Sequence, residues 1–175
     1  KKINKLNIKI IEELIKEIYL EPTKDLSFNI LFEKNNITKN LYYEDIGLSA
    51  SFISKNEILR SALLPLQHEC IRNPGLIANG RDMGTKVFPN SILKLFFTAD
   101  LDIRAERRCK QLIKNGATPN LEIIRESIKE RDKKDINRDI SPLKAAKDAV
   151  IIDSSSLNVE SILDKILELY KITGT

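Results

Sequence analysis

The apolar residues near the start of the chain fall on one face of a helix. Five of them recur at helical spacing: Ile8, Ile11, Leu14, Ile15 and Ile18. This pattern predicts an amphipathic helix within residues 1–20, which Glu21-Pro22 ends. Phe28, Ile30 and Phe32 then alternate with Asn29 and Leu31, and the turn sequence EKNN follows. The change of period predicts a small β-hairpin or meander.

The next helix begins at a capping box. Ser54 is followed three residues later by Glu57, ahead of the helical sequence ILRSALLPLQHECIRNPG. Pro65 predicts a kink or a division of this helix, because proline cannot donate the hydrogen bond that continues it. The turn sequence Asn73-Pro74-Gly75 predicts its end.

Three apolar runs in the rest of the chain predict strands: LIA (76–78), ILKLFFTA (92–99) and AVIID (149–153). Three helical patterns accompany them: residues 100–116, ending at Asn115-Gly116, the highly charged residues 120–138, and residues 158–172. Strands that alternate with helices predict an α/β fold, with a parallel sheet covered by helices on both faces.

The sequence GLIANGRDMGTKVFP (75–89) has two glycines separated by four residues, as in a phosphate-binding loop. The match fails, because apolar residues lie between the glycines and Arg81-Asp82 replaces the Lys-Ser/Thr pair of such loops. The segment instead predicts a strand that places Arg81 and Asp82 at the sheet edge where α/β folds bind ligands. Gly80 and Gly84 lie on either side of this pair, where glycine would allow another group to approach the backbone closely or would allow a positive φ angle. A simple Arg–Asp surface turn is the alternative.

A second candidate lies in the charged helix, in the sequence ERDKKDINRDISPL. Arg131, Asp135 and Arg138 are spaced i, i+4 and i+7, so they share one helical face. Salt-bridged, solvent-exposed helices often have this pattern. Two arginines and a carboxylate could equally hold a phosphate and a sugar, because the planar guanidinium binds phosphate oxygens with two hydrogen bonds.

Composition narrows the classes of function. The chain has 175 residues, 29 basic and 25 acidic, and no block of like charge or aromatic interleaving typical of a nucleic-acid binder. Cys70 and Cys109 form no C-x-x-C pair, so neither a zinc site nor a disulfide framework is indicated. His68 is the only histidine, and its place on a helix favours a structural role. No Ser-His-Asp or Cys-His set can be assembled without it, so acyl-transfer chemistry is not favoured. No apolar run approaches the length of a membrane span.

Four features together resemble the bacterial cytidylate kinases, a family of P-loop nucleoside monophosphate kinases. They are GLIANGRDMGTKVFPNS, RAERRCKQL after a strand, IKERDKKDINRDISPLKAAKDAVIIDSS, and the spacing of Ser51 and Arg60. The resemblance runs from about Thr38 to the C-terminus. It implies a cytoplasmic, monomeric phosphotransferase of pyrimidine metabolism that converts CMP or dCMP to the diphosphate with ATP and Mg²⁺. No nucleic-acid or membrane partner is expected. The alternatives are a kinase for another monophosphate such as UMP, and a non-catalytic nucleotide-binding module.

The resemblance also implies roles for individual residues on the monophosphate side. Three arginines would bind the phosphate of the nucleoside monophosphate: Arg60, Arg81 and Arg138. Asp82 would accept a hydrogen bond from the amino group of cytosine, a donor that uracil lacks at that position. Ser51 would help to hold the nucleoside, and Arg131 with Asp135 would contact the ribose hydroxyls.

On the ATP side, the resemblance implies that Arg107 stacks against adenine. The expected catalytic residues are arginines: Arg81, Arg131 and Arg138. No side chain of the chain is expected to bind a metal ion. Such a set suits phosphoryl transfer, which depends on positioning and charge neutralisation and needs no protein nucleophile.

The family resemblance predicts three parts. The core α/β domain would comprise residues 1–25, 74–113 and 139–175. Residues 26–73 would form a small, β-rich monophosphate-binding insertion, and residues 114–138 a helical lid. The first strand and the phosphate loop of the family are absent from this sequence. We therefore expect it to begin part-way through a natural protein, and not to be a competent kinase as written.

Overall fold

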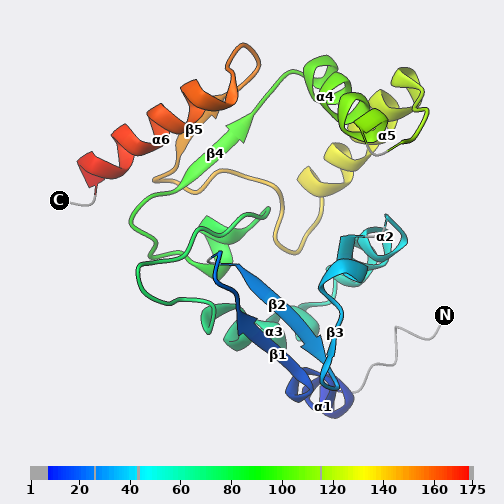
Figure 1. Ribbon diagram of the computed structural model, residues 1–175, viewed down its shortest axis with the longest axis vertical. Helices are drawn as coiled ribbons and strands as arrows, with labels where there is room; N and C mark the ends of the chain where they lie inside the picture. The colour runs from blue at the N-terminus through cyan, green and yellow to red at the C-terminus, as the bar shows by residue number, and fades with distance from the viewer. Residues whose placement is uncertain (1–7, 26, 43, 115, 174–175) are drawn as a thin grey trace. The chain divides into compact units, whose positions relative to one another are not determined.

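A computed structural model describes residues 8–25, 27–42, 44–114 and 116–173. The chain divides into two compact units, Lys1–Ile77 and Ala78–Thr175. Figure 1 shows the helices and strands of both, and each unit is considered by itself. The three-part domain division remains a prediction.

The first unit combines three helices with a three-stranded antiparallel sheet. Its elements are α1 (Ile8–Lys16), β1 (Ile18–Pro22), β2 (Phe28–Phe32), β3 (Asn35–Asn36), the 3-10 helix η2 (Thr38–Tyr42), α2 (Glu44–Ile53) and α3 (Glu57–His68). The central strand β2 pairs with β1 and with β3, so the predicted meander is confirmed. The prediction that the first helix continues to Pro22 is wrong. Residues from Ile18 onward pair with β2, and these inter-strand hydrogen bonds override the helical spacing.

The start of α3 differs from the predicted capping box. The N-cap is Asn56, whose side-chain Oδ1 accepts a hydrogen bond from the backbone N–H of Leu59 at 3.0 Å. Ser54 lies in the turn that directly follows α2, where its backbone N–H donates to the carbonyl of Ala50. Pro65 lies inside α3 and does not divide it, and the helix ends at His68, before Asn73-Pro74-Gly75.

We expect Asn56→Ala to lower the free energy of unfolding by about 1 kcal/mol, because the Leu59 N–H loses its acceptor. Asn56→Asp keeps an accepting oxygen at the same position and should retain the stability of the wild type. Urea denaturation followed by circular dichroism measures both. Equal midpoints for Asn56→Ala and the wild type would show that the cap does not stabilise α3.

The second unit holds a parallel pair of strands and three longer helices. Its elements are the single π-helical turn η3 (Met83–Val87), β4 (Leu95–Thr98), α4 (Leu101–Lys114), α5 (Leu121–Ile136), β5 (Val150–Asp153) and α6 (Val159–Thr173). The strands β4 and β5 lie side by side with Leu95 opposite Val150 (Figure 1). The most buried apolar residues of this unit are Val87, Ala105 and Ile152.

The helices α4 and α5 pack against each other, and two ion pairs join them. Arg104 Nη1 lies 2.6 Å from Asp132 Oδ2, and Arg125 Nε lies 2.5 Å from Asp102 Oδ1. The hydrogen bond from Arg125 to Asp102 is the main reason that the pKa of Arg125 is raised. The helix α5 begins at Asn120, whose side chain accepts from the N–H of Ile123.

The three predicted helices of this unit and two of its predicted strands are confirmed, the strands being shorter than expected. The strand predicted at 76–78 is wrong. Ile77 is fully exposed, and the described parts of the chain place no strand beside it to pair with. The sheet is also less covered than predicted, since Phe97 and Ile151 are exposed. A strand requires a hydrogen-bonded neighbour, so an apolar run alone does not fix one.

Candidate functional site

Three arginines surround the buried carboxylate of Asp135, which is only 6% exposed. Arg81 Nε lies 2.5 Å from Asp135 Oδ2, Arg138 Nη1 lies 3.6 Å from Oδ1, and Arg131 Nε lies 3.9 Å from Oδ2. Arg131 and Asp135 share a face of α5, as predicted, but the helix ends at Ile136. The prediction that Arg138 lies on the same helical face is therefore wrong, although the turn after α5 still brings Arg138 to Asp135. Arg81 reaches Asp135 from a segment 54 residues earlier in the chain. We call these four residues the arginine cluster.

The turn η3 places Arg81 and Asp82 at its start. The carbonyl oxygen of Asp82 accepts hydrogen bonds from the N–H groups of Thr85, Lys86 and Val87, so the chain turns tightly around it. The Asp82 residue is 5% exposed. A salt-bridged surface turn does not describe this arrangement, because Asp82 is buried and Arg81 pairs with the carboxylate of Asp135 on α5.

Gly80 and Gly84 are explained by close packing on either side of the Arg–Asp pair. A methyl group added at Gly80 would lie 2.9 Å from the Cε of Met83, and one added at Gly84 would lie 3.2 Å from the Cδ of Lys94. Positive φ angles occur at Gly75 and Gly116 instead. Of the two reasons proposed for these glycines, close approach is confirmed and positive φ is wrong.

Lys94 holds its position over Gly84 through an ion pair. Its Nζ lies 2.5 Å from Asp148 Oδ2, and its side chain is almost completely buried. The hydrogen bond from Lys94 keeps the pKa of the Asp148 carboxyl below its usual value. The ion pair thus links the segment before β4 to the segment before β5.

The chain after α5 wraps around the arginine cluster. Arg138 Nε donates to the carbonyl of Ser141, a buried residue with a φ of +49°. The backbone N–H of Leu143 donates to the carbonyl of Asp135 at 2.8 Å. These bonds fix Arg138 against the end of α5. No pattern in the sequence singles out Ser141, because its position follows from the backbone turn.

The predicted residues Ser51 and Arg60 lie in the other unit. Arg60, on α3, donates from Nη1 to the carbonyl of Ser54 at 3.3 Å. Ser51 is in α2, and its side chain lies outside the described residues. Their predicted roles beside the arginine cluster remain predictions.

Arg107 on α4 is bonded to the loop that follows β5. Its Nη1 donates to Ser154 Oγ at 3.1 Å, and its Nη2 donates to the carbonyls of Ser154 at 2.6 Å and Leu157 at 3.4 Å. Ser154 is buried. The next serine, Ser155, donates from its hydroxyl and its backbone N–H to Asp153, and these bonds keep the pKa of Asp153 below its usual value.

Sequence reasoning missed Ser154 as a partner of Arg107. The available signal was the run of three serines directly after a predicted strand, at the sheet edge where ligands of α/β proteins bind. Spacing could not show which of these serines faces α4, because the two segments are 47 residues apart.

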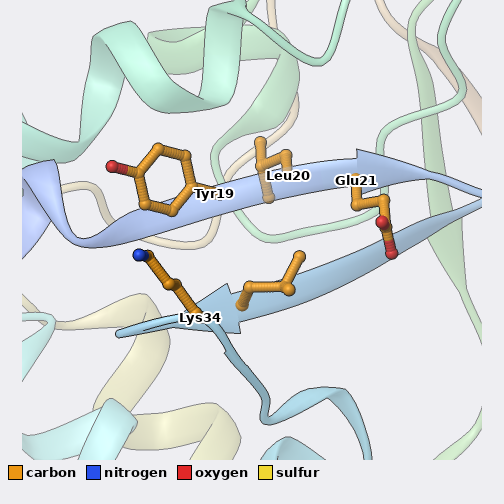
Figure 2. Close-up of a pocket in the computed structure, with 5 residues that line it drawn as sticks. Tyr19, Leu20, Glu21 and Lys34 are labelled. Carbon is orange, nitrogen blue, oxygen red and sulfur yellow. The ribbon is translucent and has the colours of Figure 1, made fainter.

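A hollow of about 380 Å³ lies beside the β1–β2 hairpin of the first unit. Figure 2 shows Tyr19 and Lys34 at one end of it and Glu21 at the other. Its lining includes none of the predicted site residues that the structure describes. A larger groove of about 610 Å³ lies between α1 and α3 and is lined in part by Ile15, Ala62 and Leu66.

Among the described residues, no helix combines the length and apolar character needed to cross a membrane.

Comparison with known proteins identifies the family of the chain. A family model described as cytidylate kinase matches residues 1–172. The chain is 40% identical over 139 residues to the cytidylate kinases of Burkholderia ambifaria and Burkholderia multivorans. It is also 40% identical over 143 residues to that of Bordetella bronchiseptica.

These matches cover 79% of the chain and 61% of the Burkholderia ambifaria relative, and 82% and 64% for the Bordetella bronchiseptica one. The chain thus spans about three fifths of the length of the curated relatives it matches. The family model covers nearly all of the chain. The chain belongs to the cytidylate kinase family.

Proposed function

We propose that the protein transfers the γ-phosphoryl group of ATP to CMP or dCMP, giving the diphosphate, and that this chain supplies the acceptor side of the site. The observation that carries the proposal is the arginine cluster, in which three guanidinium groups converge on one buried carboxylate. The cluster has a net positive charge, so a phosphate group suits it. Membership of the cytidylate kinase family supports the substrate.

The chemistry follows from positioning and charge. The guanidinium groups of Arg81 and Arg138 would bind the phosphate oxygens of the monophosphate and hold the attacking oxygen in line with the γ-phosphoryl group. Binding of the phosphate would replace the contact between Arg81 and Asp135. The Asp135 carboxylate and Arg131 would then be available for the ribose hydroxyls. The role of Arg60 as a further phosphate ligand rests on the family resemblance.

Base selection is assigned to Asp82. A carboxylate accepts hydrogen bonds and cannot donate them when ionised. It would therefore favour cytosine, which carries an amino group where uracil carries a carbonyl oxygen. Ser51 would assist in holding the nucleoside.

ATP is the proposed phosphoryl donor, with Arg107 stacking on its adenine ring. Among the residues that the structure describes, no group of three or more His, Cys, Asp or Glu side chains is placed to hold a metal ion. The cytoplasmic location, the monomeric state and the lack of nucleic-acid and membrane partners remain predictions from the family resemblance.

The experiment that tests this function compares CMP, dCMP and UMP as acceptors for ATP in the full-length protein. We expect rapid formation of CDP or dCDP and much slower formation of UDP. A preference for UMP would contradict the role of Asp82. Binding of CMP without turnover would instead indicate a non-catalytic nucleotide-binding module.

We expect Asp82→Ala to raise KM for CMP about tenfold or more, because the cytosine amino group would lose its acceptor in a buried site. KM for UMP should change much less, which provides the internal control. Steady-state kinetics with both nucleotides measures the effect. If the variant instead loses its thermal stability while KM for CMP is unchanged, Asp82 is a structural residue of the turn.

A further inference from the structure

The strands β4 and β5 are parallel neighbours, so the loops that follow them start side by side (Figure 1). Arg107 of α4 is hydrogen-bonded to the loop after β5. Thr98 is the last residue of β4 and lies opposite Asp153, the last residue of β5. In parallel α/β sheets, ligands bind beyond the carboxyl ends of the strands. Arg107 is therefore at an edge of the sheet suited to a ligand.

The hydrogen bonds of Arg107 use the edge of its guanidinium group. Its two terminal nitrogens donate to the hydroxyl and the carbonyl of Ser154 and to the carbonyl of Leu157. N–H bonds of a guanidinium group lie in its plane. The bonded edge thus faces the loop, and none of these bonds uses a flat face of the group, whose residue is exposed. Such faces stack on aromatic rings.

The partners of Arg107 are neutral, unlike those of two neighbouring arginines. Arg104 and Arg125 pair with carboxylates across the α4–α5 interface. Arg107 is bonded to a hydroxyl and two carbonyls of the loop after β5, and among the described residues no carboxylate forms an ion pair with it. The N–H groups at the edge of a guanidinium group are the ones that bind phosphate oxygens, and in Arg107 the loop already uses several of them. A positively charged, planar group held in this way suits a nucleobase better than a phosphate.

Ser154 is itself held firmly by β4. Its backbone N–H donates to the carbonyl of Thr98 at 2.8 Å, and its hydroxyl donates to the same carbonyl at 3.0 Å. Since the hydroxyl proton is directed to Thr98, its oxygen is left to accept from Arg107. The orientation of the guanidinium group is thereby tied to the end of β4.

We infer that Ser154 is a positioning residue that fixes Arg107 edge-on to the loop after β5, so that a flat face of the guanidinium group is presented to the purine ring of ATP. The inference rests on the proposed function for the identity of the nucleotide. Ser154 acts through Arg107 and does not itself contact the reacting atoms. Its contribution is to the affinity for the base, and the triphosphate is bound elsewhere.

The test measures binding of ATP to the full-length protein by isothermal titration calorimetry, with inorganic tripolyphosphate as a second probe. Ser154→Ala should weaken ATP binding by up to about tenfold, because Nη1 of Arg107 loses its hydroxyl acceptor and only the two carbonyl bonds of Nη2 still orient the guanidinium group. Binding of tripolyphosphate and KM for CMP should not change. Ser155→Ala is the matched control, since the Ser155 hydroxyl is bonded to Asp153 and to the N–H of Asp100.

A double-mutant cycle separates positioning from a general structural effect. Arg107→Ala should weaken ATP binding, and adding Ser154→Ala should then have no further effect. Additive losses would overturn the inference, as would equal losses for ATP and tripolyphosphate or an unchanged affinity of Ser154→Ala for ATP. Failure of the wild type to bind ATP would overturn it too. If the wild type binds ATP but does not phosphorylate CMP, the proposed function is wrong. The affinities of the wild type and of Ser154→Ala for ATP and tripolyphosphate still decide the role of Ser154.

Discussion

Arg81→Ala is expected to lower kcat/KM for CMP phosphorylation about a thousandfold, within the range for removing a group that stabilises phosphoryl transfer. Arg81 is the member of the arginine cluster that comes from the turn η3, and its Nε makes the shortest contact to Asp135. Alanine removes both the charge and the planar fork that would bind the phosphate. A coupled assay of nucleotide diphosphate formation measures the loss.

Two further variants show whether this loss is specific to Arg81. Arg81→Lys keeps the charge but not the fork, so its kcat/KM should fall between those of the wild type and the alanine variant. Arg108→Ala removes an exposed arginine whose guanidinium is bonded to Gln111 on the same helix, and should leave turnover unchanged. Unchanged kcat/KM in Arg81→Ala would exclude Arg81 from the phosphate site.

The helices of the second unit could be predicted from sequence because their signals are local. The residues of α5 carry helical spacing and a polar N-cap at Asn120, and the helix forms where the pattern indicates. Strands depend on partners that are distant in the chain. The apolar residues 76–78 have the composition of a strand but no pairing among the described residues, whereas Ile18 has helical spacing and pairs with Phe32.

The site was predictable to the extent that its residues lie close together in sequence. Helical spacing places Arg131 on the same face of α5 as Asp135, and the structure confirms this pair. Arg138 reaches Asp135 from the turn after the helix, which spacing did not predict. The contact of Arg81 with Asp135 joins segments that no periodicity relates. The same is true of Arg107 and Ser154. The family resemblance could suggest roles for the arginines, but only the fold identifies the groups that orient them.

The arginine cluster also has a structural function, because the Asp135 carboxylate holds together three groups that would otherwise repel one another. The side chain of Arg138 is only 11% exposed, and its Nε is used by the Ser141 carbonyl. A nucleotide phosphate bound in the cluster would neutralise part of the positive charge that Asp135 otherwise neutralises. If the cluster binds the substrate as proposed, stability and substrate binding depend on the same contacts.

Removal of this carboxylate is consequently expected to have the largest effect on stability. Asp135→Ala should lower the free energy of unfolding by about 2 kcal/mol, because Arg138 would remain buried without its counter-charge. The loss should be smaller than that for a fully buried ion pair, since the side chains of Arg81 and Arg131 are 37% and 58% exposed and stay partly hydrated. The midpoint of urea denaturation measures the effect.

Arg131→Ala is the matched control on the same helix. It removes the weakest and most exposed contact to Asp135, and should cost no more than about 0.5 kcal/mol. Sulfate or phosphate should restore the stability of Asp135→Ala more than it stabilises the wild type, because an anion that binds only the folded cluster shifts the unfolding equilibrium. If Asp135→Ala unfolds at the same urea concentration as the wild type, the carboxylate serves the ligand alone and does not hold the arginines together.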